Sequence, residues 1–197
     1  MKRNTGAIAL AALLTGSLAW NFSGPPAAAA ESYYKGKTIK MVVRSNPGGG
    51  YDFYGRLLAR HMPKYIPGNP NMVVINMPGA GGIVAANYMM NRAKRNGTEI
   101  SILTRELALA QRTGEVGVKY DLHKLTAIGS AASSTFLIVM SKKNPVQTFA
   151  QLKKTKKTVL FAATGPGAGS YQYPALLKND GFNVKIITGY MGGQARF

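Results

Sequence analysis

TIKMVVRSNPGGGYD, residues 38–52, joins an apolar β-branched run directly to a glycine-rich turn. The run from Thr38 to Arg44 is typical of a buried strand. Pro47 to Gly50 then turns the chain, and Asp52 is expected to cap the helix that follows. The stretch therefore predicts a strand, a glycine loop and a helix in succession, which is the repeating unit of α/β proteins.

A strand followed by a helix recurs twice before residue 125, the first time with a glycine loop between them. The first helix is expected to bury Phe53, Leu57, Leu58 and Met62, and Pro63 should end it. Further elements in this part are strands at 72–76 and 99–104, a glycine loop at 78–82, a helix at 83–94 stopped by Asn96-Gly97, and a helix that starts in 105–112.

A second group of elements is expected after residue 125. It comprises strands at 126–129, 136–141, 158–163 and 183–188 and helices at 148–154 and 171–179. Pro174 is compatible with the last helix only if it lies in the first turn. The whole pattern predicts an α/β fold with a mainly parallel sheet, divided into one part at 31–125 and another at 126–197.

The first 30 residues have the order of a secretory signal. Lys2 and Arg3 precede an uncharged, mostly apolar run from Ala7 to Trp20, and Ala28 and Ala30 offer a small-residue cleavage site. We expect cleavage near Ala30 and release into the periplasm, with an uncleaved membrane anchor as the alternative.

The amino-acid composition indicates the charge of the ligand and excludes several kinds of catalytic and metal site. The 197 residues include 25 lysines and arginines but 7 acidic residues, a formal net charge of +18 that attracts anions. With no cysteine and 2 histidines, disulfides, thiol catalysis and cysteine-ligated zinc are excluded, and a catalytic metal site is not expected.

Three glycine-rich loops follow strands and open helices: 47–52, 78–82 and 164–170. Glycine leaves backbone N–H groups accessible, and a helix N-terminus adds donors and partial positive charge, so such loops bind carboxylate or phosphate. In open α/β sheets they gather at the carboxyl ends of the strands. The alternative is that the glycines serve only as turns.

Enzyme and nucleic-acid motifs are weak. Residues 165–169 do not form G-x-G-x-x-G, and neither a G-K-[ST] phosphate loop nor a G-x-S-x-G elbow is present. The lysines at 153–157 are typical of a solvated face, so no nucleic-acid partner is expected. The prediction is a binding protein rather than an enzyme, without a cofactor.

Four motifs resemble one known family. They are Pro47-Gly48-Gly49-Gly50-Tyr51-Asp52 with Arg56-Leu57-Leu58-Ala59; Asn76-Met77-Pro78-Gly79-Ala80-Gly81-Gly82; Tyr120-Asp121; and Thr164 to Ser170 followed by Tyr190-Met191-Gly192. In this order and spacing, over residues 37–196, the chain resembles the substrate-binding receptors of tripartite tricarboxylate transporters, the Bug-type periplasmic solute-binding proteins.

The resemblance implies a two-lobed, Venus-flytrap fold of the type II periplasmic-binding-protein kind. It implies a monomer that captures a small tricarboxylate, dicarboxylate or aromatic acid and delivers it to membrane transporter subunits. The ligand-binding residues it implies are Gly48, Gly49, Gly50, Asp52, Gly79, Ala80, Gly81, Thr104, Thr164, Gly165, Ser170 and Tyr190. Asp52 is expected to brace its loop rather than to touch the anion.

Two departures from the family pattern matter. Tyr51 stands where the family usually has a small hydroxyl residue, which suggests a bulkier or more apolar ligand. The chain is also shorter than family members, so we expect an incomplete second lobe and no return of the chain to the first. The alternatives to a carboxylate receptor are a truncated remnant that binds nothing and a nucleotide-binding α/β enzyme.

Overall fold

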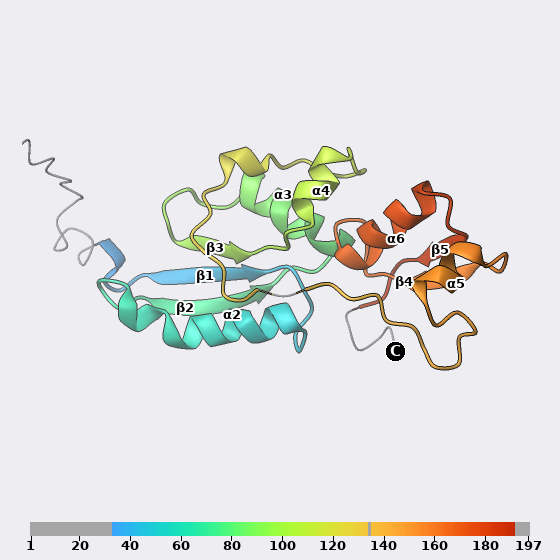
Figure 1. Cartoon of the computed structure of the whole chain (residues 1–197). Coiled ribbons are helices and arrows are strands. Elements are labelled where there is room, and N and C mark those ends of the chain that lie inside the picture. The colour runs from blue at the N-terminus through green and yellow to red at the C-terminus, as the bar shows by residue number, and fades with distance from the viewer. Residues whose placement is uncertain (1–32, 134, 192–197) are drawn as a thin grey trace, which may run out of the picture.

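The computed structural model describes residues 33–133 and 135–191 and shows a mixed α/β chain with two small parallel sheets (Figure 1). In the first unit, residues 33–125, the elements are β1 (Thr38–Val43), α2 (Gly50–His61), β2 (Asn71–Asn76), α3 (Ile83–Asn91), β3 (Glu99–Ile102) and α4 (Leu107–Arg112). In the second unit, residues 135–191, they are α5 (Phe149–Lys154), β4 (Val159–Ala162), α6 (Gly169–Asn179) and β5 (Val184–Ile187). Short 3-10 turns occupy Pro63–Tyr65, Ala80–Gly82 and Leu122–Lys124.

The first sheet has the strand order β2-β1-β3, and both pairings are parallel. Val43, the last residue of β1, pairs with Asn76 on β2 and with Ile102 on β3. Because the three strands end at the same level, the loops that follow them meet at one edge. The predicted parallel α/β arrangement is confirmed at this level.

Helix α2 covers one face of the first sheet, and α3 and α4 lie on the other (Figure 1). Leu58 of α2 and Met62, the residue that follows the helix, pack on the core of Met41, Val43 and their neighbours. The predicted apolar face was wrong in part, because Phe53 is 64% exposed and Leu57 42% exposed. Gly55 is the residue of this helix that lies against the sheet. A Cβ atom added to it would come within 2.5 Å of Val43 Cγ2.

The other face of the first sheet is covered by a cluster of Ile83, Ala86, Leu107 and Tyr120. Helix α3 ends at Asn91, before the predicted end at residue 94, and β3 ends at Ile102 rather than 104. Burial raises the pKa of Tyr120 to about 12, and its hydroxyl donates to the carbonyl of Leu107.

The second unit pairs β4 with β5 in parallel around a core of Val146, Leu152, Val159 and Val184. Thr148 caps α5, with its hydroxyl accepting from the backbone N–H of Gln151. Helix α6 begins at Gly169, two residues before its predicted start. Pro174 therefore lies inside the helix, beyond the first turn, and the prediction of a first-turn proline was wrong.

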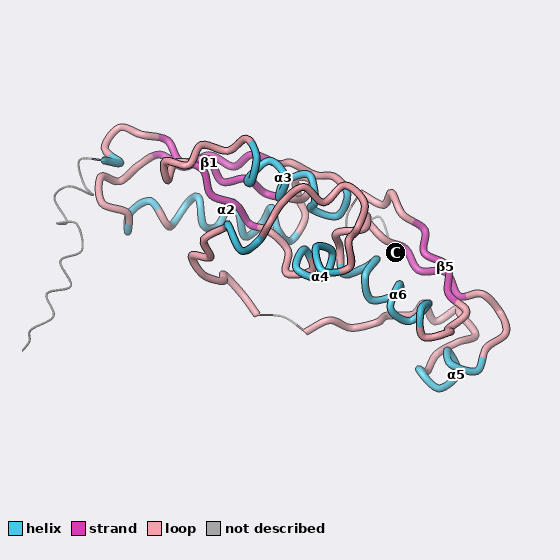
Figure 2. Tube along the Cα trace, turned by 90° about the horizontal axis from the view of Figure 1, so that it is seen from above, coloured by secondary structure: helices cyan, strands magenta, loops and turns pink. Residues whose placement is uncertain are grey.

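The strands predicted at 126–129 and 136–141 are absent: their described residues form no ladder. A strand needs a neighbour to accept its hydrogen bonds, and this segment runs as an open connection between the units (Figure 2). Leu137 is 79% exposed and Val139 65% exposed. The proposed signal segment, residues 1–30, and Gly192 lie outside the described residues. Within the described ranges, no helix is long and apolar enough to cross a membrane.

Candidate anion-binding site

A cavity of about 270 Å³ lies where the two units meet. Its lining residues are Arg44, Ser45, Asn46, Pro78, Gly79, Ala80, Gly81, Thr164, Gly189, Tyr190 and Met191. They come from the segments that follow β1, β2, β4 and β5, so both parallel sheets present the carboxyl ends of their strands to the same space. This is where α/β proteins bind ligands.

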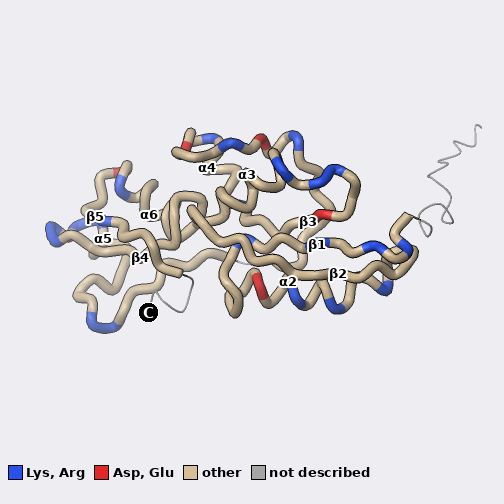
Figure 3. The backbone as a smooth tube through the Cα atoms, turned by 180° about the vertical axis from the view of Figure 1, so that it is seen from behind, with Lys and Arg blue, Asp and Glu red and all other residues tan. Residues whose placement is uncertain are grey.

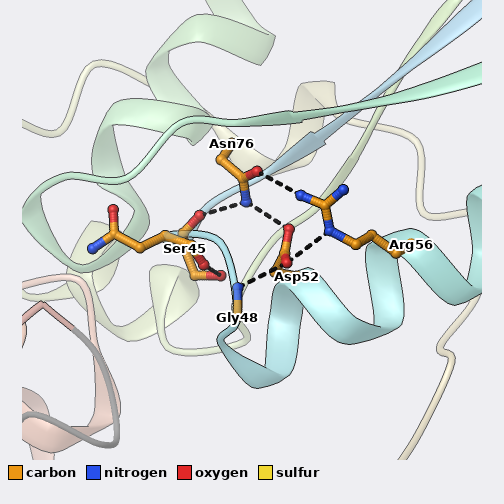
Figure 4. A network of polar contacts seen from close by, with 6 residues as sticks. Ser45, Gly48, Asp52, Arg56 and Asn76 are labelled. Atoms are coloured by element: carbon orange, nitrogen blue, oxygen red, sulfur yellow. Dashed lines mark hydrogen bonds and ion pairs between the residues drawn. The ribbon is translucent and has the colours of Figure 1, made fainter.

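Asp52 anchors the first glycine loop. Its carboxylate accepts hydrogen bonds from the backbone N–H of Gly48 at 2.9 Å, from Arg56 Nε at 2.9 Å and from Asn76 Nδ2 at 2.8 Å (Figure 4). The bond from Arg56, with those from Asn76 and Gly48, lowers the pKa of Asp52 to about 2 against the opposing effect of burial. The N-cap of α2 is Gly49, so the prediction of Asp52 as the cap was wrong; its carboxylate instead accepts from the Gly48 N–H in the loop before the helix.

The same network joins the first two loops. Asn76, the last residue of β2, donates through Nδ2 both to Asp52 and to the backbone carbonyl of Ser45 at 2.9 Å (Figure 4). Ser45 lines the cavity, so the network sets the position of one of its walls. The carboxylate of Asp52 is hydrogen-bonded within this network, and Asp52 is not among the lining residues of the cavity.

The second and third glycine loops touch each other backbone to backbone. The N–H of Gly167 donates to the carbonyl of Ala80 at 3.0 Å. A Cβ atom on Gly81 would lie 2.4 Å from the Ala168 nitrogen, and one on Gly165 would lie 2.7 Å from the Gly81 nitrogen. Gly81 also has φ +69°, which favours glycine. Glycine is therefore needed for the units to approach at this point.

A further contact closes the opposite side of the cavity. Asn46 Nδ2 donates to the carbonyl of Met191 at 2.9 Å, which links the end of β1 to the segment after β5. The backbone N–H of Tyr190 donates to Ala163 at 3.2 Å, so this segment continues alongside the end of β4. Tyr190 thus lines the cavity from the second unit.

Arg44 supplies the charge of the cavity. It is the one charged residue among the described lining residues, and none of these is acidic. Its guanidinium carbon lies 4.5 Å from the centroid of the Tyr51 ring, and the Tyr51 hydroxyl donates to Thr104 Oγ1 at 3.1 Å. Thr104 in turn donates to the carboxylate of Glu106. The unusual Tyr51 therefore lies beneath Arg44 rather than among the lining residues.

Thr164 places a buried hydroxyl at the wall of the second unit. Its Oγ1 atom is inaccessible to solvent and has no hydrogen-bond partner among the described residues. The backbone N–H of Thr164 donates to Ser170 Oγ at 3.3 Å, so Ser170 holds the loop from which the hydroxyl projects.

The structure divides the predicted site residues into two groups. Gly79, Ala80, Gly81, Thr164 and Tyr190 line the cavity. The others do not line it: Gly48 and Gly49 lie in the first glycine loop, Gly50 and Asp52 in the first turn of α2, Thr104 beside Gly82, Gly165 in the contact between loops, and Ser170 next to the Thr164 backbone.

Sequence reasoning missed the segment directly after β1, the proline that opens the second glycine loop, and the residues that flank Tyr190. These residues are Arg44, Ser45, Asn46, Pro78, Gly189 and Met191. Arg44 ends the predicted strand and carries a charge, which is the signal that could have identified it.

Charge elsewhere is spread over the surface. Lys and Arg occur along α2 and around α5, while acidic positions are few (Figure 3). In the part of the chain that the structure describes, no group of three or more histidine or acidic residues could hold a metal ion.

Two curated proteins are similar to this chain. It is 27% identical over 168 residues to the "UPF0065 protein in gbd 5'region" of Cupriavidus necator, covering 85% of this chain and 48% of that protein. It is 29% identical over 183 residues to the "UPF0065 protein in the TAR-I ttuE-ttuC' intergenic region" of Agrobacterium vitis, covering 90% of this chain and 50% of that protein. No protein-family model matches the sequence. The chain spans about half the length of these relatives and is a distant relative of proteins that carry the UPF0065 label.

Proposed function

We propose that the chain is a solute-binding protein that captures a small carboxylate in the cavity between its two units. The observation that carries the proposal is the lining itself: a single arginine, no acidic residue, and backbone from glycine loops of both units. Such a surface favours an anion, because Arg44 provides charge and the loops provide backbone groups. The volume of about 270 Å³ suits a small acid rather than a larger ligand.

The lining residues favour a binding protein over an enzyme. Its hydroxyl residues are Ser45, Thr164 and Tyr190, and the described lining contains no histidine, lysine or carboxylate that could act as a base. The glycine loop at 165–169 also lacks the spacing of a dinucleotide site. A nucleotide-binding enzyme therefore has less support.

The wider role is proposed from the relatives. The UPF0065 label includes Bug-type receptors of tripartite tricarboxylate transporters, and the glycine motifs of this chain resemble theirs. We propose export to the periplasm, a two-lobed receptor architecture with a monomeric chain, and delivery of a tricarboxylate, dicarboxylate or aromatic acid to transporter subunits. The competing possibility is that the chain as given does not bind a carboxylate; it spans about half the length of the relatives.

Thermal unfolding of the full chain with citrate, succinate, glutamate and benzoate tests the proposal. A ligand at about 100 times its dissociation constant should stabilise the chain by about 2.7 kcal/mol. Sulfate and phosphate at equal ionic strength control for general anion effects, and ATP and NAD test the nucleotide alternative. A transition raised by one carboxylate supports the proposal. A broad transition that no acid moves would contradict carboxylate binding by this chain, and a shift with nucleotides alone would favour the enzyme.

A further inference from the structure

The Arg44 side chain is held against two other parts of the first unit. Its guanidinium carbon lies over the Tyr51 ring, 4.5 Å from the ring centroid. A Cβ atom on Gly82 would lie 3.1 Å from Arg44 Cδ, so the aliphatic part of the side chain runs close to the backbone at the start of α3. These two contacts restrict a long side chain that ordinarily has many rotamers.

The Tyr51 ring is itself held in place by buried groups. Its hydroxyl donates to Thr104 Oγ1 at 3.1 Å, and the Thr104 hydroxyl donates to the carboxylate of Glu106. Thr104 is 5% exposed and Glu106 is 3% exposed, and Arg105 Nε donates to the same carboxylate at 3.0 Å. The ring also packs on the core of the first sheet. The support for Arg44 is therefore anchored in the interior of the first unit.

A contact with an aromatic ring leaves the donors of an arginine available. The ring contacts the face of a guanidinium, whereas the N–H donors lie in the guanidinium plane, where they can form paired hydrogen bonds with a carboxylate. A side chain that is already positioned also loses less rotamer freedom when an anion binds. A residue that never touches the acid can therefore strengthen its binding.

We propose that Tyr51 is a positioning residue, which holds Arg44 in the orientation that binds the carboxylate. The inference rests on the proposed function and adds a supporting residue to it. Tyr51 is not among the described lining residues, so its ring supports Arg44 without enclosing the ligand. In place of the bulkier ligand that the sequence suggests, positioning predicts that removal of the ring weakens the binding of every acid by a similar factor.

The test is calorimetric titration of the full chain with citrate, succinate, glutamate and benzoate. Tyr51→Leu removes the ring and should weaken each acid that binds by about threefold to tenfold. Tyr51→Phe keeps the ring and loses only the hydrogen bond to Thr104, so it should bind as the wild type does. In chains that carry Arg44→Gln, Tyr51→Leu should have no further effect, because the side chain through which it acts is absent.

Tyr65→Leu is the matched control. Tyr65 also has a cation over its ring, Lys64 Nζ at 4.9 Å from the centroid, but it is 76% exposed and does not line the cavity. Its removal should leave every affinity unchanged. Melting temperatures report whether each variant folds, and Tyr51→Met replaces Tyr51→Leu if the leucine variant does not. Ligand-observed NMR extends the measurement to weak binding by the Arg44→Gln chains.

The outcomes separate the two proposals. Equal weakening by Tyr51→Leu with and without Arg44 overturns the positioning role, as does a Tyr51→Phe chain that binds as weakly as Tyr51→Leu. A changed order of preference among the acids in Tyr51→Leu would assign Tyr51 a direct contact with the ligand and overturn the role too. In each of these cases carboxylate capture stands. Binding of none of the acids by the wild type overturns both proposals.

Discussion

The backbone N–H of Gly167 donates to the carbonyl of Ala80 at 3.0 Å, across the boundary between the two units. The bond joins a loop after β2 to a loop after β4, and neighbouring glycines bring the two backbones together. The relative position of the units at the cavity therefore depends on positions where a side chain cannot be added.

Gly165→Ala should disrupt this contact. The new Cβ would lie 2.7 Å from the Gly81 nitrogen and 2.8 Å from the Ala80 carbonyl carbon, and backbone atoms cannot move aside cheaply. We expect a loss of about 1–3 kcal/mol in unfolding free energy and weaker carboxylate binding. Urea denaturation and titration measure the two effects. Gly129→Ala, at a glycine with open space around it, is the control and should change neither.

Gly55→Ala should destabilise the first unit although alanine ordinarily favours a helix. The added Cβ would lie 2.5 Å from Val43 Cγ2, and Val43 is fully buried and branched at Cβ. Instead of the usual gain of about 0.5–1 kcal/mol from glycine to alanine, we expect a loss of about 1–3 kcal/mol. Denaturation of the single variants and of the double variant with Val43→Ala checks the cause. An additive double variant would contradict a direct clash, because relief of the clash requires coupling.

Asp52→Asn should weaken the chain at neutral pH and remove part of its acid sensitivity. The pKa of Asp52 is lowered from 3.8 to about 2, so its charged form stabilises the fold above about pH 4, and this contribution is lost as the pH falls through about 2. A shift of this size corresponds to about 2 kcal/mol or less, since Arg56 is half exposed and screened. Urea denaturation between about pH 7 and about pH 1 measures it, with exposed Asp180→Asn as the control. A difference between wild type and Asp52→Asn that persists below pH 2 would rule out the charge as the cause.

Arg44→Gln should reduce carboxylate affinity by roughly tenfold to hundredfold, because hydrogen bonds to charged groups contribute about 1.5–3 kcal/mol each. Titration calorimetry with the tightest-binding acid provides the measurement. Arg60→Gln removes the same unit of charge from the exposed side of α2 and distinguishes contact from the long-range field. Equal losses in the two variants would assign the effect to net charge and not to the cavity.

The parallel strands and the glycine loops could be predicted because their signals are local. The apolar runs of β1 and β2 and the glycines that follow them are sufficient to place both elements. The face of α2 could not be read in this way, because the residue closest to the sheet is Gly55, which has no apolar side chain to count. The failed strand at 136–141 has the composition of a strand, yet its described residues have no neighbour to pair with.

For the candidate site too, positions with a local sequence signal could be predicted and positions that depend on distant contacts could not. Loop positions such as Gly79 and Thr164 were found because glycine-rich segments after strands mark a sheet edge. The contribution of Arg44 depends on Tyr51 lying beneath it and on a second sheet opposite, and these are relationships between distant parts of the chain.

The hydrogen bond from Asn46 to Met191 spans 145 positions of sequence, so the cavity belongs among the most non-local features of the chain. Contacts of such separation form late in folding, because closing a long loop precedes any gain from the contact. A chain synthesised in sequence order would hold both early glycine loops well before the cavity could form. The walls of the cavity would then come together only after residue 191 is available to pair with Asn46.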